Sequence, residues 1–506
     1  MANEFKAVSL QELKIRYENV LKNVANMLDR NGPIYSTWIE FQMGLDDSNT
    51  VRFSTSSSDK RENLIASLNV TKSCGGMANE FTLVIQYDPF NFGQDTDLRG
   101  NIEKLDSFIA MAMSEGFLSG TQQLRCKIRY GYNSFASYID DDLVSPRYSL
   151  FLTGATSNVS FDSGITTYTF TGVSELSVDC DFITNFKGVK EEQHLLEIVG
   201  RILYQYYGSI EKKPSFITDD SITPVSGEVS YYIDISNDDI ADSVMITTDG
   251  TTATQSPWNY CQMLLESNPL TISELDNGAY ETTDTNVISI NKRPRYSMTI
   301  SDIDGRETIH VTHIEPSKVT INGKDQENKA LSLDYEFSWG ARDEKSSNKN
   351  IVTGWRPEVN LYDYLIRSAN SIRYKKLQEL AKTSKEYEEI YKSYAGYSDE
   401  VVEMYNAELE IIGVPADPPF GAEIRVLPRI LESFSRTQGI YIITGASDEI
   451  SNNGVFRSKL KLFRKGSIDV NNDVAKKSNI NDDIIKNLAK QAEKLIPYSY
   501  PLNPFR

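Results

Sequence analysis

The sequence predicts a mainly β protein with α+β insertions, on three observations. Short segments in which apolar and polar residues alternate recur along most of the chain, and glycine or proline separates many of them. The clearest such segment is residues 331–339, LSLDYEFSW. Helical periodicity is confined to a few longer segments. Short strands at this density, with glycine-bearing turns, are typical of small barrels and sandwiches.

Length and charge limit the class of protein. The chain has 506 residues, which predicts about three or four domains. Its net charge is -19, and an acidic surface repels phosphate backbones, so sequence-specific binding of nucleic acid is not expected. No apolar run reaches about 18 residues and no secretory signal is visible, so membrane insertion is not expected either. The four cysteines are widely spaced, which favours free thiols.

Residues 9–29 are expected to form an amphipathic helix. Ser9 and Glu12 have the spacing of a capping box. One face carries apolar residues at helical spacing, among them Leu13, Tyr17, Val20 and Val24. This face is a candidate contact for a partner protein, and packing on the chain's own core is the alternative.

A second short amphipathic helix is expected at 481–496. Its apolar positions include Ile484, Leu488 and Leu495. They are candidates for the same two roles, contact with a partner or packing on the core.

The order of the segments predicts five parts. Strands dominate two regions, which are separated by an acidic region of mixed character and flanked by the helices. The expected parts are an N-terminal helical extension at 1–35, a first β-barrel domain with an insertion at 36–190, an α+β intermediate domain at 191–345, a second β-barrel domain with an inserted long helix at 346–465, and a linker with a C-terminal helix at 466–506.

The residues that usually carry catalysis or metal binding are scarce. The chain has only three histidines, His194, His310 and His313. The last two are three residues apart, and on a strand such residues point to opposite faces, so they are not expected to share a metal. No phosphate-binding loop and no nucleophile elbow is present. We therefore expect no catalytic residue, no cofactor, no metal site and no enzymatic activity.

The stretch from Ala407 to Arg464 resembles the tail-hub proteins of contractile-tailed phages and related injection machines, including the hub part of valine-glycine-repeat spike proteins. A strand ends in Gly413-Val414-Pro415, and further strands follow at 420–426, 439–443 and 454–464. Residues 79–85 and 167–172 resemble strands of the family's first barrel. One departure is Asp448, expected in a turn where relatives often have histidine.

The resemblance implies two small hub-type β-barrels separated by the α+β domain. It also implies a homotrimeric tail or baseplate hub. Three copies would form a pseudo-sixfold ring that joins a sixfold tail tube to a threefold central spike, and DNA would pass through the channel. The implied partners are the spike protein, a tube or distal tube-initiator protein and other baseplate proteins. The implied location is the virion, after assembly in the host cytoplasm.

Two other functions remain open from the sequence. One is a β-rich protein that binds a receptor or cell surface, and the other is a tail-associated cell-wall hydrolase, for which no acid pair stands out. Within the hub hypothesis the expected site residues are structural. They are the candidate barrel corners Gly413, Pro415, Gly421, Gly439 and Gly454, for which an ordinary loop role is the alternative.

Overall fold

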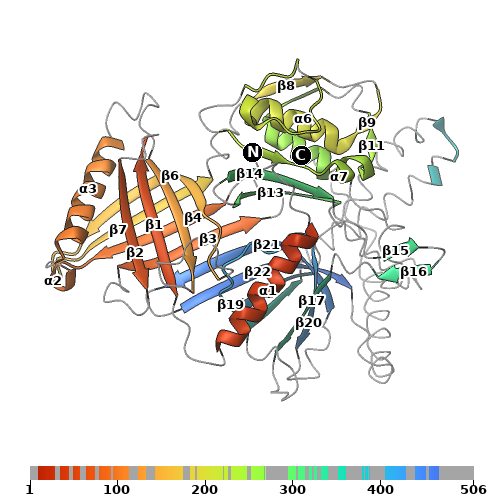
Figure 1. The fold of residues 1–506 in the computed structure, drawn as a ribbon. Coiled ribbons are helices and arrows are strands. Elements are labelled where there is room, and N and C mark those ends of the chain that lie inside the picture. Colours follow the sequence, from red (N-terminus) through yellow and green to blue (C-terminus); the bar gives the residue numbers. More distant parts are fainter. Residues whose placement is uncertain are drawn as a thin grey trace, which may run out of the picture.

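The computed structural model describes residues 10–28, 35–174, 183–268, 295–339, 351–359 and 405–466, with short gaps inside these ranges, and a few residues between 376 and 387. In this part of the chain the fold is mainly β with α+β elements, as the sequence predicts (Figure 1). The predicted C-terminal helix, with Ile484, Leu488 and Leu495, lies outside the described residues. The long helix expected inside the second barrel domain falls at 361–394, and most of it also lies outside the described residues.

The first β unit, called the N-unit below, covers residues 36–174. Its strands pair in the order β3-β4-β7-β6-β5-β1-β2, and all of these pairs are antiparallel. They are β1 (Ser36–Met43), β2 (Thr50–Ser56), β3 (Ile65–Ser73), β4 (Glu80–Tyr87), β5 (Leu124–Gly131), β6 (Tyr148–Val159) and β7 (Thr166–Ser174). Helices α2 (Pro89–Phe92) and α3 (Thr96–Ala112) follow β4, and α3 packs beside β2 (Figure 1).

The second β unit, called the C-unit below, covers residues 332–466. Its strands pair in the order β18-β19-β22-β21-β20-β17. They are β17 (Ser332–Trp339), β18 (Val352–Val359), β19 (Tyr405–Ile412), β20 (Glu423–Pro428), β21 (Gly439–Ser451) and β22 (Val455–Gly466). Helix α1 (Leu10–Leu28) packs against β17.

The α+β elements lie between the two units in the sequence. They include a three-stranded sheet with the order β10-β14-β13 (Figure 1). Helices α6 and α8 pack against each other. The elements are β8 (Thr184–Lys187), β9 (Gln193–His194), α6 (Leu195–Tyr207), η2 (Ile210–Lys212), β10 (Tyr232–Asp234), α7 (Asn237–Asp242), β11 (Met245–Ile246), β12 (Thr252–Gln255), α8 (Pro257–Glu266), β13 (Tyr296–Ile303) and β14 (Arg306–His313). The hairpin β15 (Lys318–Ile321) and β16 (Lys324–Glu327) follows.

The N-unit and the C-unit share one sheet. Strand β21 pairs with β3, and this ladder joins the two units into a 13-stranded sheet. The sheet is curled, as Figure 1 shows. The buried side chains of α1 and both units form one hydrophobic core, whereas those of the α+β elements form a second core. The two predicted barrel regions are therefore continuous with each other.

The segment 331–339 is a strand as predicted. The expected domain boundary at 345 would assign this strand to the α+β domain, and the strand pairing does not agree with that. Strand β17 pairs in parallel with β20, with Phe337 opposite Val426, and so belongs to the C-unit. Alternation shows that a segment is a strand with one buried face. It does not show which distant strand it pairs with, and that decides the boundary.

The apolar face of α1 lies in the chain's own core. Tyr17, Val20 and Val24 are each 1% exposed, and Leu13 is half-buried. Side chains this deeply buried cannot meet a partner, so the structure corrects the interpretation of this face as a partner contact and favours the core alternative. The physical reason is that the helix covers the open face of β17, which would otherwise expose apolar side chains to water.

Candidate functional site: the junction between the two β units

The junction between the units is built on a buried lysine of β3. Lys72 is 2% exposed, and its Nζ lies 2.9 Å from Oδ1 of Asp417 and 3.0 Å from Oδ2 of Asp448. Asp448 lies within β21 and Asp417 in the loop after β19, so one N-unit cation meets two C-unit carboxylates. The expected place of Asp448 in a turn is therefore wrong. Its side chain points into the core from the middle of a strand and is 3% exposed.

Hydroxyl groups donate further hydrogen bonds to the two carboxylates. Tyr130 of β5 donates a hydrogen bond to Asp448, and Ser458 of β22 donates another over 2.5 Å. Tyr148 of β6 donates to Oδ1 of Asp417 over 2.8 Å. Buried charges are tolerated where they are paired and hydrogen-bonded, as Lys72, Asp417 and Asp448 are here.

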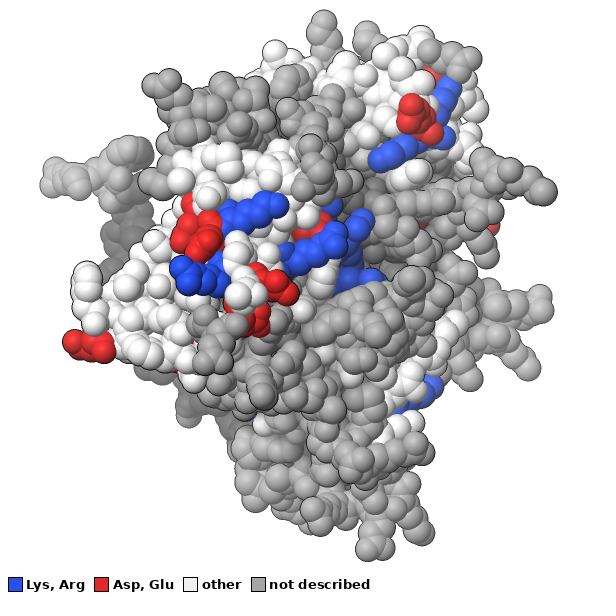
Figure 2. Space-filling model, turned by 60° about the vertical axis from the view of Figure 1, so that its left-hand side comes forward, with Lys and Arg blue, Asp and Glu red and all other residues white. Residues whose placement is uncertain are grey.

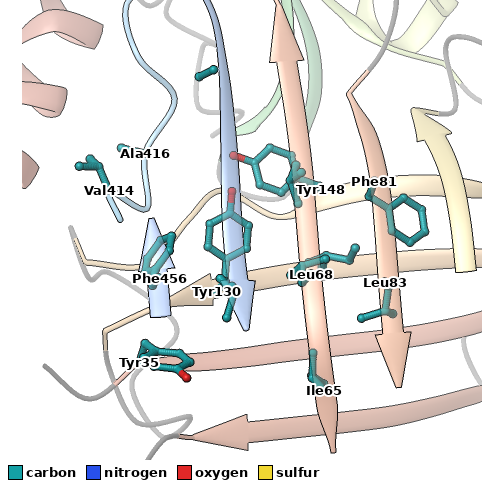
Figure 3. Close-up of a cluster of buried hydrophobic side chains, with 14 of the residues drawn as sticks. Tyr35, Ile65, Leu68, Phe81, Leu83, Tyr130, Tyr148, Val414, Ala416 and Phe456 are labelled. Atoms are coloured by element: carbon teal, nitrogen blue, oxygen red, sulfur yellow. The ribbon is translucent and has the colours of Figure 1, made fainter. Parts of the chain in front are cut away.

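Aromatic rings enclose this polar group. In Figure 3, Tyr130 and Tyr148 of the N-unit lie on the side of Phe456, Val414 and Ala416 of the C-unit, and the hydroxyl oxygens of the two tyrosines converge. Lys72 Nζ lies 4.8 Å from the ring centroid of Tyr148, within cation–π range. The rings of Tyr130 and Phe456 meet edge to face, with centroids 5.6 Å apart. Apolar contact and ion pairing therefore join the same two units.

The site shifts the pKa values of its own members. Burial lowers the pKa of Lys72, but Asp417 and Asp448 raise it by more, so the net pKa lies well above its usual value. Burial raises the pKa of Tyr130, and the charge of Asp448 raises it further. Burial also raises the pKa of Tyr148, with Asp417 adding to it. At neutral pH the lysine is therefore charged and both phenols are neutral, as the hydrogen bonds require.

Gly413 is the candidate corner residue with the closest contact. It follows β19, its N–H donates to the carbonyl of Phe456 over 2.8 Å, and its carbonyl accepts from the hydroxyl of Tyr132 over 2.6 Å. A Cβ added to it would lie 2.2 Å from the ring of Phe456. The backbone at this position therefore approaches the core more closely than any residue with a Cβ could.

We expect Gly413→Ala to destabilise the chain by about 1–3 kcal/mol, because the new methyl group overlaps the Phe456 ring and forces it to move. Urea unfolding followed by circular dichroism measures this. Gly100→Ala in α3 is the matched control. No atom lies within 4 Å of its new Cβ, so that variant should be neutral or slightly more stable. Equal stability of the two variants would show that the close approach at Gly413 has no energetic importance.

The other candidate corner residues are placed separately. Gly421 has a φ of 84°, a conformation that favours glycine, and its N–H donates to the carbonyl of Ile443. Pro415 lies in the turn after Gly413, and Gly439 is the first residue of β21. Gly454 lies outside the described residues. Their assignment as structural corners remains a prediction.

The histidines of the HxxH pattern have separate surroundings. His310 is 2% exposed and its Nδ1 lies 2.7 Å from Oδ2 of Asp234 in the α+β core. His313 lies at the end of β14, where its ring meets that of Tyr296. Among the described residues, no group of three or more His, Cys, Asp or Glu could hold a metal ion. In the same part of the chain, no helix has the length and apolar character needed to cross a bilayer.

The two β units repeat one topology. The N-unit strands lie in the order β3-β4-β7-β6-β5-β1 and the C-unit strands in the order β18-β19-β22-β21-β20-β17, with corresponding strands in the same chain order. Four of the five ladders are antiparallel in both units. The difference is the last ladder, antiparallel between β1 and β5 but parallel between β17 and β20. In addition, β2 extends the N-unit.

The repeat extends to single residues. Strand β6 contains Thr153-Gly154-Ala155, and β21 contains Thr444-Gly445-Ala446 at the corresponding place. Both ladders have an irregularity at the threonine, after which the glycine resumes the pairing. A β-bulge shared at one register position, with the same three residues, is strong evidence that the two units are equivalent.

A second shared irregularity lies on the neighbouring ladder. The register shifts between Ile65 and Ser67 in β3, and between Val352 and Gly354 in β18. The hydrogen bonds beside these shifts correspond as well. Gln86 N–H donates to Leu64, and Ile412 N–H donates to Ile351. The resemblance indicated that the first β region is similar to the second, and the Thr-Gly-Ala repeat is a further signal in the sequence that it did not include.

Comparison with known proteins finds distant similarity. No family model and no curated protein matches the chain. Among solved structures, it is similar to a tail protein from Neisseria meningitidis, at 8% identity and a TM-score of 0.38, over 85% of this chain and 97% of that one. A 43 kDa tail protein of prophage MuSo2 from Shewanella oneidensis gives 9% identity and a TM-score of 0.38, over 84% of this chain and 98% of that one.

A third similar structure is the E. coli c3393 protein, a component of the type VI secretion system described as similar to the T4 bacteriophage tail proteins gp27 and gp5. It gives 8% identity and a TM-score of 0.36, over 79% of this chain and 74% of that one. These structures are of the class that the sequence resemblance indicates, phage tail proteins and their type VI relatives. All the TM-scores are below 0.5, and the strand pairing of the chain itself is the stronger evidence for a function.

Proposed function

We propose that this chain is a structural tail protein, a hub of which three copies form a ring of six β units. The observation that carries the proposal is the internal repeat. Because each chain contains two units with the same strand order and the same bulges, three chains arranged in a ring present six similar units. Such a ring has true threefold symmetry and approximate sixfold symmetry, and closed rings are the usual outcome of head-to-tail association.

This symmetry suits a protein placed between two others. The six similar units would face a sixfold tail tube, and the threefold arrangement would accept a threefold central spike. Other baseplate proteins would contact the outside, and DNA would pass through the channel without sequence-specific contact. We place the assembled ring in the virion, at the tail or baseplate. In this function the candidate corner residues, including Gly413 and Gly421, are structural and no residue is catalytic.

The buried junction supports this proposal. In a ring, the two units of one chain must keep a fixed angle so that all six match their partners. The ion pairs of Lys72 with Asp417 and Asp448 fix the register and orientation of the units, because a buried charge loses its partners if the strands slip. The group is almost closed to solvent, which suits a structural role rather than the binding of a substrate.

The mass in solution tests the proposal. We expect size-exclusion chromatography with light scattering to give a species of about 171 kDa, three copies of the 57.1 kDa chain. The measurement covers a concentration series and is repeated with the neighbouring spike and tube proteins, which serve as templates if the chain alone is monomeric. A chain that stays monomeric in their presence would refute the hub.

A further inference from the structure

The second half of β21 has a neighbour on both sides. From Gly445 to Ser451 it pairs with β22 on one edge and with β3 on the other. The corresponding half of β6, from Gly154 to Val159, pairs with β7 alone within the described part of the chain. Among the described residues, the N-unit therefore has an unpaired stretch of strand where the C-unit has a paired one, with β13 approaching β6 without pairing to it.

Burial at the corresponding positions differs in the same way. In β21 the core-facing residues are at most 3% exposed: Ala446, Asp448 and Ile450. Their counterparts in β6 face solvent: Ala155, Ser157 and Val159. Val159 is 48% exposed, although its counterpart Ile450 is 3% exposed. The unpaired half of β6 is therefore also more exposed than the corresponding half of β21.

The edge strand of the C-unit, β18, also lacks a partner on one side among the described residues. Strand β18 corresponds to β3, and within the described residues it pairs with β19 only. Leu68 and Val70 of β3, which pair with Ile450 and Asp448 of β21, are 0% exposed. Their counterparts in β18, Trp355 and Pro357, are half-buried and exposed. The half-unpaired strand β6 and the edge strand β18 thus correspond to the two strands that form the junction within the chain.

We propose that β18 of one copy adds to the open half of β6 of the next copy, in the register that β3 and β21 use within the chain. This rests on the proposed ring and names the surface that closes it. The register places Val159 opposite Trp355 of the second copy and Asn158 opposite Arg356, as Ile450 lies opposite Leu68 and Glu449 opposite Asn69. The contact is head to tail, and a rotation of about 120° between copies would close it into the proposed ring of three copies.

The backbone N–H groups of Ser157 and Val159 in β6 point to the unpaired edge. Ser160 donates its N–H to the carbonyl of Ile165 in the turn that leads to β7. Because N–H groups alternate in direction along a strand, those of Ser157 and Val159 point away from β7, to the open edge. Pro357 is the counterpart of Val70 and has no N–H to donate. At this position the proposed ladder therefore has at most one hydrogen bond fewer than the ladder between β3 and β21.

The side chains fit a second copy better than an unrelated strand. The register places no two like charges opposite each other, since Thr156 meets Glu358 and Asn158 meets Arg356. The one large apolar side chain exposed on this half of β6, Val159, meets Trp355, whose ring already packs against Tyr441 at 5.2 Å. Pairing would remove both from water.

Disulfide trapping tests the register. In Asn158→Cys/Arg356→Cys the two cysteines lie on strands that are seven strand spacings apart, a path of roughly 34 Å along the curled sheet, so a bridge within one chain is not expected. Between copies they face each other, so mild oxidation should give covalent dimers and closed trimers on a non-reducing gel. The matched control, Asn158→Cys/Glu358→Cys, is displaced by two residues and should cross-link at least about tenfold more slowly.

The outcomes separate this inference from the proposed function. A trimer that forms no cross-link, or that cross-links equally with both pairs, overturns the β6–β18 interface and leaves the hub standing. A chain that remains monomeric with the spike and tube proteins present overturns both. The wild-type chain, with its own four cysteines, gives the background.

A proline at the edge gives an independent test. Ser157→Pro removes an N–H that points away from β7, so the circular dichroism and the melting temperature should stay close to those of Ser157→Ala. Assembly of the proline variant should weaken by about tenfold or more, since Pro357 of the next copy cannot replace the lost bond. Unchanged assembly of Ser157→Pro would overturn the proposed pairing.

Discussion

Lys72→Met is expected to destabilise the chain by about 3–5 kcal/mol. The substitution removes the cation that pairs with Asp417 and Asp448 and leaves two carboxylates in a largely buried site. Losing one member of a buried ion pair costs more than the pair itself contributes, because the remaining charge stays desolvated. The loss should appear as a lower urea midpoint with an unchanged slope, measured by circular dichroism.

The control for this variant is Lys461→Met. Lys461 lies on β22, on the exposed face of the same sheet, and its replacement should change stability by less than about 0.5 kcal/mol. The double variant Lys72→Met/Asp448→Asn should lose less than the sum of the two single variants, because each removes a charge that the other leaves unpaired. Strict additivity would show that the two side chains do not interact.

Alkaline pH is expected to unfold the chain from the same site. Tyr130 and Tyr148 have pKa values raised above the ordinary value of about 10, and the pKa of Lys72 is raised as well. As the pH passes about 10, the unfolded chain releases protons that the folded chain retains, so the free energy of unfolding falls with pH. The stabilisation is complete below the unfolded pKa and is lost as the pH rises through the folded pKa.

The ultraviolet absorbance of tyrosinate and the circular dichroism, followed together, measure this effect. Buried tyrosines should ionise only as the secondary structure is lost. In Tyr148→Phe one titrating group is missing, so the fall in stability with pH should be shallower by up to about 1.4 kcal/mol per pH unit. Its stability at neutral pH, where Asp417 has lost a donor, is measured separately. Ionisation of both tyrosines in the folded state would contradict the prediction.

The described surface has charges of both signs close together. Figure 2 shows Lys and Arg near Asp and Glu on the described part of the face that it brings forward. Exposed ion pairs occur in the described part of the chain, such as Arg99 with Glu103 in α3. Exposed pairs contribute little to stability, so the two largest effects are expected at the buried junction.

The local pattern predicted much of the fold. The expected strand at 439–443 is part of β21, and most of the expected strand at 454–464 is part of β22, because short apolar runs between turn residues favour strands. Helix α1 was expected at 9–29 and lies at Leu10–Leu28. The stretch that resembles the tail-hub proteins, Ala407 to Arg464, also contains Gly413 and Asp448 of the junction.

The candidate site was largely missed. Lys72 and Asp448 are 376 positions apart in the chain, and nothing near either residue marks it as buried or paired. Their partners Tyr130 and Asp417 come from two further segments. A buried lysine in an alternating strand has the same local pattern as an exposed one, since only the neighbouring strand determines which environment it meets.

By itself, the sequence determined where the strands and the first helix lie, and it contained the Thr-Gly-Ala repeat that marks equivalent places in the two units. These features depend on near neighbours, through alternation, turn residues and helical spacing. Only the tertiary structure decided that β17 joins the C-unit, that α1 is buried and that β3 pairs with β21. Long-range pairing places Lys72 between two carboxylates and, within the described residues, leaves half of β6 and one side of β18 unpaired. Which strand edges meet is a property of the folded sheet as a whole.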